Sequence, residues 1–340
     1  MRVSIVIDNY NYEAFVGQAI ESALAQTYPD VEVVVVDDGS RDGSAAVIER
    51  YAQRHAGRVV VLRKPNGGQG SAYNVGFARS RGDVVIFLDA DDWLYREAVA
   101  RIVAAWQPGV SKVQFRLDMV GPGGEPFGRQ LPRQMHAGED AERLVCEFGT
   151  YGSPPGSGNA FSAGFLRQVL PMDEPTWRIA ADSVPILLAP AHGRVLSLDQ
   201  ALGAYRVHRP KDDGSLLFNN APAGLAAEYE RIAAGKRMVV EGLQRVRSEH
   251  ASPLAYAPWE VRTLALCLRF GGQALRERLR DAPDGRTGFL LASIWRWPAL
   301  SLDRKLAMAA WTLAVMWLPQ PLALRLARWH RRSAGQPVPA

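Results

Sequence analysis

Short apolar runs that end in acidic or amide turns recur through the first hundred residues, and this alternation constrains the fold more than any other feature. The runs consist mainly of Val, Ile and Leu, a composition typical of strands buried on both faces of a parallel sheet. They lie at Val3–Ile7, Val31–Val36, Val59–Leu62 and Val84–Leu88. Apolar residues spaced three and four apart over Ala14–Thr27 and Ser44–His55 predict helices between the first three strands.

Strands that alternate with helices predict a parallel sheet, because each connection crosses one face of the sheet in the right-handed sense. We therefore predict an α/β fold with a doubly wound, mostly parallel sheet flanked by helices. Beyond residue 215 the pattern changes, since residues 224–250, 256–280 and 286–332 have helical periodicity. The prediction is one α/β domain over residues 1–215 and a mainly α-helical region over residues 216–340.

Polar residues follow three of the predicted strands, at Asp8–Asn11, Asp37–Ser40 and Asp89–Asp92. In a parallel sheet the carboxyl ends of the strands meet at one edge, where ligands bind. One such group would be an ordinary turn rich in Asp, Asn and Gly. Three acidic turns at one edge repel one another, and a cation or a ligand would offset that repulsion. We expect the functional site at this edge.

The usual glycine-rich phosphate-binding motifs are missing, since no GxGxxG follows the first strand and no GxxxxGK[ST] occurs. Phosphate charge would therefore be handled by a metal ion. The pair Asp89 and Asp91 suits this role, because carboxylate oxygens bind Mg²⁺ or Mn²⁺ and leave positions open for substrate phosphates.

Several ordered motifs together resemble family 2 glycosyltransferases of the GT-A fold. The resemblance is strong over residues 3–95, patchier to Tyr205–His208, and absent beyond about residue 215. The motifs that carry it are Val3–Ile7 with Asn9–Asn11, Ala19–Tyr28, Val36–Ser44, Asn66–Gly70, Asn74–Gly76, Gly82–Asp83 and Phe87–Asp92. The resemblance implies a nucleotide-sugar glycosyltransferase domain over residues 1–215.

The resemblance also implies roles for the residues that match these motifs. Asp38 would contact the uracil or ribose of a UDP-sugar, and Asp89 would face the ribose and diphosphate. Asp91 would ligate the metal, Mn²⁺ or Mg²⁺. In the segment after the last strand, Arg206 would contact the diphosphate and His208 the metal.

Asn9 and Tyr10 would line the nucleotide end of the site. The residue before them is usually Pro or a small polar residue in this family. Here it is Asp8, and this departure puts the contacts to the base or the metal in doubt.

The catalytic base of the family is an acidic residue on the acceptor side, commonly preceded by Glu. The matching position is Asp182, with Ala181 in place of that Glu. A capping or surface role for Asp182 is the alternative. As base, Asp182 would take the proton of the acceptor hydroxyl in an inverting, in-line displacement of UDP.

The function predicted from the sequence is a metal-dependent, inverting glycosyltransferase. It would move a sugar from a UDP-sugar to a glycan or lipid-linked acceptor in bacterial-type surface polysaccharide synthesis. One alternative is a sugar-phosphate nucleotidyltransferase, which needs a Gly-rich basic loop after the first strand that Asp8–Tyr12 does not provide. A non-catalytic basic binding protein is the other. We expect no nucleic-acid partner, because the motifs are acidic.

The charge of the chain is uneven. Residues 1–205 contain 19 Lys or Arg and 24 Asp or Glu, whereas residues 206–340 contain 21 and 11. Residues 286–332 combine five of the nine tryptophans with eight basic residues and a single Asp303. This composition predicts helices that lie on an anionic membrane surface. Packing on the catalytic domain and formation of a homodimer are the alternatives.

The remaining features concern the compartment. Cys146 and Cys267 lie far apart in the sequence without a CxxC spacing. We therefore predict that both are core residues and that the protein occupies a reducing compartment. Asp8 follows a short apolar run at the start of the sequence, and this pattern does not fit a signal peptide. We therefore expect a cytoplasmic protein, peripheral on the inner face of the cell membrane if the tail binds lipid.

Overall fold

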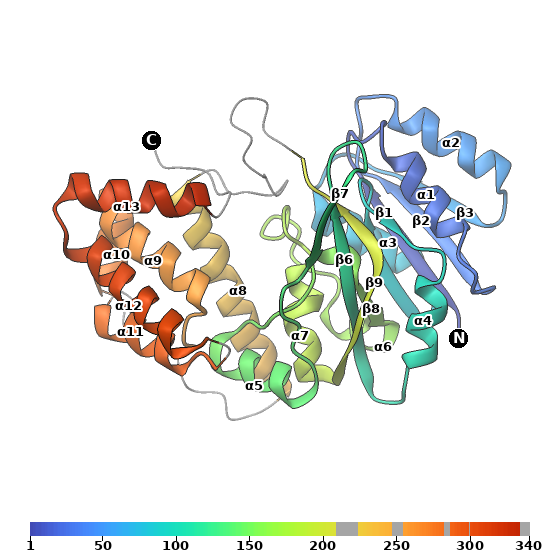
Figure 1. Cartoon of the computed structure of the whole chain (residues 1–340). Coiled ribbons are helices and arrows are strands. Elements are labelled where there is room, and N and C mark those ends of the chain that lie inside the picture. The colour runs from blue at the N-terminus through green and yellow to red at the C-terminus, as the bar shows by residue number, and fades with distance from the viewer. Residues whose placement is uncertain (209–223, 247–253, 282–285, 299, 334–340) are drawn as a thin grey trace. The chain divides into compact units, whose positions relative to one another are not determined.

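The computed structural model describes residues 1–208, 224–246, 254–281, 286–298 and 300–333. The chain divides into two compact units, which can be followed by colour in Figure 1. The first comprises Met1–Val145 and Tyr151–Val207, and the second comprises Cys146–Thr150 and His208–Ala340. The domain boundary expected at residue 215 lies outside the described residues.

Nine strands of the first unit form one sheet in the described part of the chain, in the order β3-β2-β1-β4-β8-β6-β9-β5, with β7 paired to β6. Strands β1 to β4 pair in parallel, and β8 and β5 run antiparallel to their neighbours. The strands are β1 (Val3–Asn9), β2 (Val31–Asp37), β3 (Val59–Arg63), β4 (Val84–Asp89), β5 (Trp93–Leu94), β6 (Val110–Val120), β7 (Pro126–Leu131), β8 (Asn159–Ser162) and β9 (Arg194–Arg206).

Helices cover both faces of the parallel strands, and this explains their continuous apolar runs. Ile5 and Ile7 of β1 share a core with Val16 and Ile20 of helix α1. On the opposite face, Gly76 of helix α3 lies so close to Val6 that an added Cβ atom would be 2.4 Å from its side chain. Because both faces are apolar, β1 and β2 are buried along nearly their whole length.

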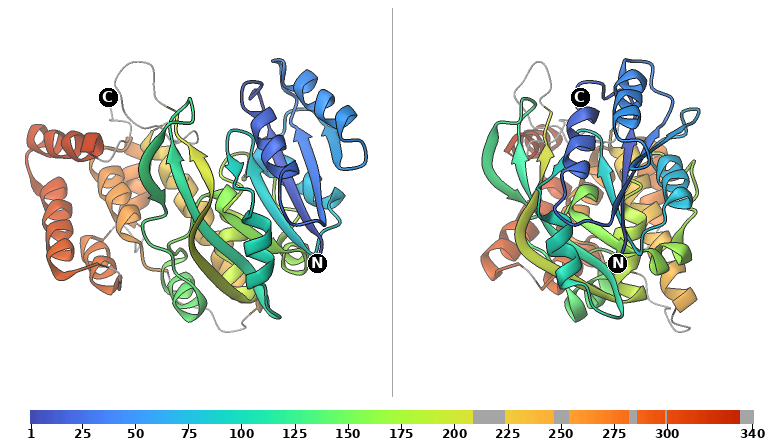
Figure 2. Two further views of the ribbon diagram at one scale, coloured as in Figure 1. Left: turned by 45° about the vertical axis from the view of Figure 1, so that its right-hand side comes forward. Right: turned by 90° about the vertical axis from the view of Figure 1, so that its right-hand side faces the viewer.

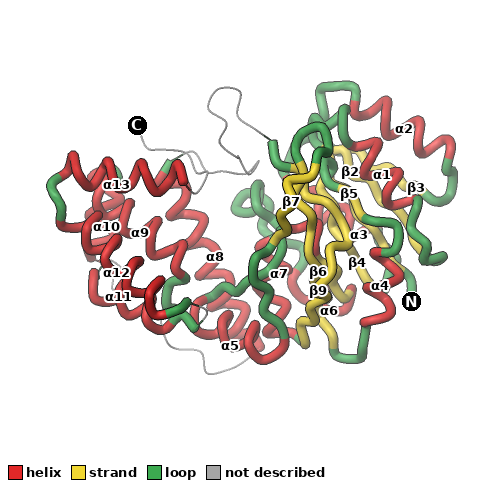
Figure 3. The backbone as a smooth tube through the Cα atoms, viewed as in Figure 1, coloured by secondary structure: helices red, strands yellow, loops and turns green. Residues whose placement is uncertain are grey.

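The helices of the first unit connect these strands, as Figures 2 and 3 show. They are α1 (Val16–Leu24), α2 (Ser44–Arg54), α3 (Gln69–Arg79), α4 (Ala98–Ala105), α5 (Gly138–Phe148, whose last residues belong to the second unit), α6 (Ala163–Val169) and α7 (Ser183–His192). The predicted α/β class and the helical C-terminal region are confirmed. Beyond β4 the sheet is mixed, an arrangement that the alternation of strands and helices does not predict.

The second unit is helical around its own apolar core. Its helices are α8 (Leu225–Val246), α9 (Pro258–Phe270), α10 (Gln273–Asp281), α11 (Thr287–Arg296), α12 (Leu302–Trp317) and α13 (Gln320–Ser333). Cys267 is wholly buried in this core beside Val261 and Leu264. The expectation of one helix over residues 256–280 is wrong, because Gly271 and Gly272 separate α9 from α10.

No helix among the described residues is both long and apolar enough to cross a membrane. The stretch Leu306–Leu318 of the tail, which is apolar apart from Thr312, lies mostly within α12.

Candidate active site

The register of the parallel strands brings the predicted polar groups to one edge of the sheet. Asp8 at the end of β1 is paired with Asp89 at the end of β4. Asn9 is paired with Asp37 at the end of β2. Strand β1 lies between β2 and β4, so the turns that follow all three strands meet around its carboxyl end.

A cluster of carboxylates occupies the turn after β4. Asp89, Asp91 and Asp92 each offer an oxygen within 4.8 Å of the others. Asp92 accepts a hydrogen bond of 2.8 Å from the backbone N–H of Arg206 at Oδ1. Its Oδ2 atom is buried and makes no hydrogen bond of normal geometry, which leaves a buried acceptor available to a cation.

The electrostatics of this acidic cluster favour an added positive charge. Burial raises the pKa of Asp8 to about 8, and the charges of Asp91 and Asp182 add to the rise. Burial and then the charge of Asp8 raise the pKa of Asp89 well above its usual range. Burial and Asp91 raise the pKa of Asp92 in the same way. A divalent cation would relieve this crowding, so these residues fit Mg²⁺ or Mn²⁺.

Gln69, the first residue of α3, connects the acidic cluster to the segment that carries Asp182. Its Nε2 atom donates to Asp89 Oδ1 at 3.2 Å, and its Oε1 atom accepts from the backbone N–H of Ala181 at 3.0 Å. Asp182 directly precedes α7, and its Oδ2 atom accepts from the backbone N–H of Gly156 at 3.1 Å. It makes no capping hydrogen bond to α7, so the capping interpretation finds no support.

Asp38 is buried, and the segment 64–68 surrounds its carboxylate. Its Oδ1 atom accepts from the Lys64 ammonium group and from the Gly67 N–H, and its Oδ2 atom accepts from the Asn66 amide and from the Gly68 N–H. An ionised carboxylate accepts about four hydrogen bonds. Asp38 therefore orders this segment in the structure, in addition to any contact with a nucleotide.

Asn9 ends β1 and Tyr10 follows it, but their environments differ. Asn9 is buried, and its amide donates to Asp37 at 3.1 Å and to the Ser40 hydroxyl at 3.0 Å. The Tyr10 side chain is 41% exposed. Asn9 thus joins the turns after β1 and β2, whereas the ring of Tyr10 is accessible to a ligand.

Arg206 lies at the end of the first unit, and His208 follows it two residues later in the sequence. Arg206 ends β9 and is buried, and its guanidinium group donates to protein acceptors through all three nitrogen atoms. His208 is counted with the second unit, and its predicted contact with the metal stays a prediction.

Sequence reasoning missed several residues that surround the site. Tyr73 of α3 is fully buried and stacked on Phe87, with ring centroids 3.9 Å apart. Lys112 of β6 is fully buried, and its ammonium group donates to the Ser153 hydroxyl at 2.7 Å. Burial lowers the pKa of Lys112 well below its usual range, and Asp182 opposes that shift. No local signal singles out Lys112, because the strand Val110–Val120 also contains Gln114, Arg116 and Asp118.

The first unit is thus an α/β domain with an acidic ligand site at the carboxyl edge of its parallel strands. Residues 4–169 match the family model described as glycosyl transferase family 2. An uncharacterized glycosyltransferase of Nostoc sp. is 36% identical over 210 residues, which cover 61% of this chain and 65% of that protein. Residues 4–169 thus carry a glycosyl transferase family 2 domain.

Two further comparisons concern the activity and the fold of similar proteins. A poly(ribitol-phosphate) beta-glucosyltransferase of Bacillus spizizenii is 36% identical over 104 residues, 30% of this chain and 16% of that protein. The chain thus spans less than two thirds of the length of these relatives. The crystal structure of S. aureus TarS 1-349 aligns with a TM-score of 0.56 at 17% identity, covering 98% of this chain and 88% of that one. This alignment supports the GT-A-like fold.

Proposed function

We propose that this protein transfers a sugar from a UDP-sugar to a hydroxyl group of a glycan or lipid-linked acceptor, with inversion, in bacterial-type surface polysaccharide synthesis. The observation that carries the proposal is the acidic cluster at the end of β4, joined through Gln69 to the segment that holds Asp182. The family match supports the reaction class. TarS has been solved in complex with UDP and with UDP-GlcNAc, which favours the same class of donor here.

The donor would lie against the ends of β1, β2 and β4. We propose that Asp91 and His208 hold Mn²⁺ or Mg²⁺, and that Asp89 and Asp92 of the acidic cluster contribute negative charge to this site. When bound, such an ion neutralises charge on the diphosphate leaving group. Asn9 and Tyr10 would line the nucleotide end, and Asp38 would contribute there both directly and through the segment 64–68 that it orders.

Asp182 would act as the general base. The acceptor oxygen forms a bond to the anomeric carbon while the bond from that carbon to the diphosphate breaks, and UDP leaves with the electron pair. Asp182 takes the proton of the acceptor hydroxyl, and this help is worth about 10²–10⁴-fold in rate. The N–H of Gly156 donates to one carboxylate oxygen of Asp182 and thereby orients the proposed base.

The test is release of free UDP from a panel of UDP-sugars, with Asp91→Ala as the first variant. We expect wild-type turnover with at least one donor and acceptor, loss of turnover with EDTA, recovery on addition of Mn²⁺ or Mg²⁺, and loss in Asp91→Ala. Release of inorganic diphosphate from UTP and a sugar phosphate would instead identify a nucleotidyltransferase. Full turnover in excess chelator would contradict the metal requirement alone.

We also propose that the tail attaches the protein to the inner face of the cell membrane, as a peripheral protein with an anionic lipid partner. Seven of the twelve large apolar side chains that are exposed among the described residues lie between Trp295 and Leu322. On α12, the exposed large apolar residues are spaced four and seven positions apart in the sequence, which places them on one face of the helix. These are Leu302, Leu306, Leu313 and Trp317; we call them the exposed α12 face.

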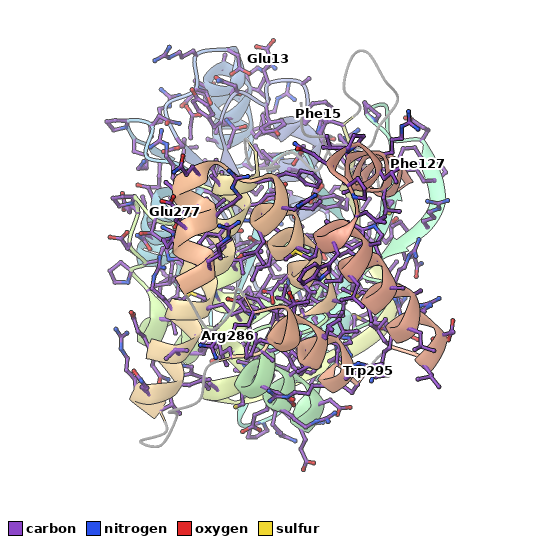
Figure 4. All side chains as sticks on the ribbon, turned by 90° about the vertical axis from the view of Figure 1, so that its left-hand side faces the viewer. Glu13, Phe15, Phe127, Glu277, Arg286 and Trp295 are labelled. Atoms are coloured by element: carbon purple, nitrogen blue, oxygen red, sulfur yellow. The ribbon has the colours of Figure 1, made fainter. Side chains whose placement is uncertain are left out.

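The opposite side of α12 is already occupied within the second unit. Met308, Thr312 and Val315 are buried, so the exposed α12 face is not needed for packing there. Trp297, one of the predicted interfacial tryptophans, also belongs to that core, because it packs edge-on against Phe148 and Trp259. Figure 4 labels Trp295, which lies in the last turn of α11 and is exposed.

A membrane explains the exposed α12 face better than a second copy of the chain does. A symmetric dimer would bring the same surface of both copies together. Residues 286–332 contain eight basic residues against a single Asp303, so two such surfaces would repel each other. An anionic bilayer attracts the same charges, at about 1 kcal/mol for each Lys or Arg near the surface.

A further inference from the structure

Arg206 donates hydrogen bonds to the turn that contains the acidic cluster. Its backbone N–H donates to Asp92 Oδ1 at 2.8 Å, and its Nε–H donates to the carbonyl oxygen of Asp91 at 2.9 Å. One residue thus holds both a side chain and the backbone of the turn after β4. These contacts join residues more than a hundred positions apart in the sequence.

The rest of the guanidinium group is also bound to protein atoms. Its Nη1 atom donates to the carbonyl oxygens of Gly121 and Pro122, and its Nη2 atom donates to Gln18 Oε1 at 2.7 Å. Arg206 therefore ties α1 and the turn after β6 to the acidic cluster.

Aromatic rings complete the environment of this cation. The Arg206 guanidinium carbon lies 4.6 Å from the centre of the Phe15 ring and 5.0 Å from that of the Trp93 ring; Phe15 is labelled in Figure 4. Arg206 is only 4% exposed. A contact with a diphosphate would require it to leave these rings and carbonyl oxygens, at a large cost in buried hydrogen bonds.

We infer that Arg206 is a positioning residue that holds Asp91 and Asp92 in the geometry for binding a divalent cation, and that it does not contact the donor. The inference rests on the proposed metal role of the acidic cluster. Arg206 also places a permanent positive charge beside these carboxylates. A lysine would keep the charge, but it cannot make the planar set of hydrogen bonds or stack in the same way on Phe15 and Trp93.

The test is Mn²⁺ binding without nucleotide, measured by calorimetry on the full chain. In Arg206→Lys we expect the Kd for Mn²⁺ to rise about 10–100-fold, the range for residues that orient metal ligands. Gln18→Met, which removes one acceptor of the guanidinium group, should give a smaller rise. Arg116→Lys is the matched control, because Arg116 is a partly buried arginine that donates to Asp199 and to a backbone carbonyl. The Kd of this variant for Mn²⁺ should equal that of the wild-type protein.

The outcome that would overturn the inference is an unchanged Kd for Mn²⁺ in Arg206→Lys together with weaker UDP binding, because a direct diphosphate contact predicts that result. Hydrogen exchange of segment 89–94 without any ligand provides the second measurement, and we expect faster exchange in Arg206→Lys. If wild-type protein binds no Mn²⁺, the proposed metal role fails, and the exchange experiment alone decides whether Arg206 holds the turn. Unchanged exchange in that case would reject the inference as well.

Discussion

Asp182 and Gly156 are 26 residues apart in sequence, and their hydrogen bond orients the carboxylate that we propose as the general base. Asp182→Asn keeps the shape of this side chain and removes its basicity. We expect kcat to fall by about 10²-fold or more while the Kd for UDP stays nearly unchanged. Steady-state kinetics combined with UDP calorimetry measures both quantities.

The control for this prediction is Asp173→Asn. Asp173 is an exposed carboxylate that accepts a hydrogen bond from the nearby Thr176 N–H, and its replacement should leave kcat within about twofold of wild type. Wild-type turnover in Asp182→Asn would place the base at another residue, and Glu174 would be the next candidate.

Asp38 shows how one carboxylate can serve both stability and binding. Asp38→Ala removes the acceptor of the Gly67 and Gly68 N–H groups and the anionic partner of Lys64, which keeps its hydrogen bond to the Pro65 carbonyl oxygen. Loss of one partner of a buried ion pair costs about 3–5 kcal/mol, so we expect a lower midpoint of urea unfolding. UDP should also bind more weakly in this variant, and the wild-type protein should bind UDP more tightly than ADP or GDP.

Lys64→Met separates the two roles of Asp38, because it removes the cation and leaves the carboxylate with three of its hydrogen bonds. We expect a smaller loss of stability and retained preference for UDP. Equal affinity of the wild-type protein for UDP, ADP and GDP in calorimetry would reject the assignment of Asp38 to the nucleotide.

At the scale of elements, the segment that carries Gly156 depends on a neutral histidine. His136 Nδ1 accepts a hydrogen bond from the Gly152 N–H at 2.9 Å. Burial lowers the pKa of His136; the charge of Arg143 acts in the same direction and that of Asp140 opposes it. The folded protein thus favours neutral imidazole. Its contribution to stability is complete above the unfolded pKa, near 6.5, and is lost as the pH falls through the lowered value.

His136→Asn tests this, because the amide oxygen of Asn can accept the same hydrogen bond at any pH. We expect the thermal midpoint of the wild-type protein to fall more between pH 7 and pH 5 than that of His136→Asn. Thermal denaturation followed by circular dichroism measures the difference, and parallel curves for the two proteins would show that His136 does not carry this pH dependence.

The exposed α12 face leads to a prediction about lipid binding. The full chain should sediment with vesicles that contain anionic lipid, less so at high salt because charge attraction is screened. Replacing Leu306 and Trp317 by Ser removes two exposed apolar side chains, and we expect the partition coefficient to fall about tenfold or more. Ile179→Ser is the control, since Ile179 is a similarly exposed apolar residue of the first unit.

Two outcomes would contradict the membrane assignment. Full-length protein that stays in the supernatant with anionic vesicles at low salt would reject it. Dimerisation in sedimentation velocity that is lost in the variant with Leu306 and Trp317 replaced would show instead that a second copy covers the exposed α12 face.

At the scale of the whole molecule, the chain forms two hydrophobic cores, and the apolar residues of each follow a different spacing in the sequence. The first contains the Val and Ile runs of the parallel strands with their covering helices. The second contains apolar residues spaced along helices α8 to α12, with a buried ion pair in which Lys236 donates to Glu260 at 2.7 Å. The charge divides in a similar way, since residues 1–205 are net acidic and residues 206–340 net basic.

The sequence by itself determined the parallel half of the sheet and the place of the site. The runs that form β1, β2, β3 and β4 were predicted to within one or two residues, because continuous apolar runs that alternate with helices are typical of strands buried on both faces of a parallel sheet. Their order then brings the acidic turns to one edge. The pair Gly271 and Gly272 also indicates, in the sequence alone, the break between α9 and α10.

Only the tertiary structure decided the partners of the side chains at that edge. Gln69 joins Asp89 to a segment 112 residues away, and Arg206 reaches Gln18 across 188 residues. Such contacts depend on pairings such as β6 with β9, for which no local sequence pattern exists. A motif can therefore locate a carboxylate or a guanidinium group, but hydrogen bonds from distant segments decide whether it is free to bind a ligand.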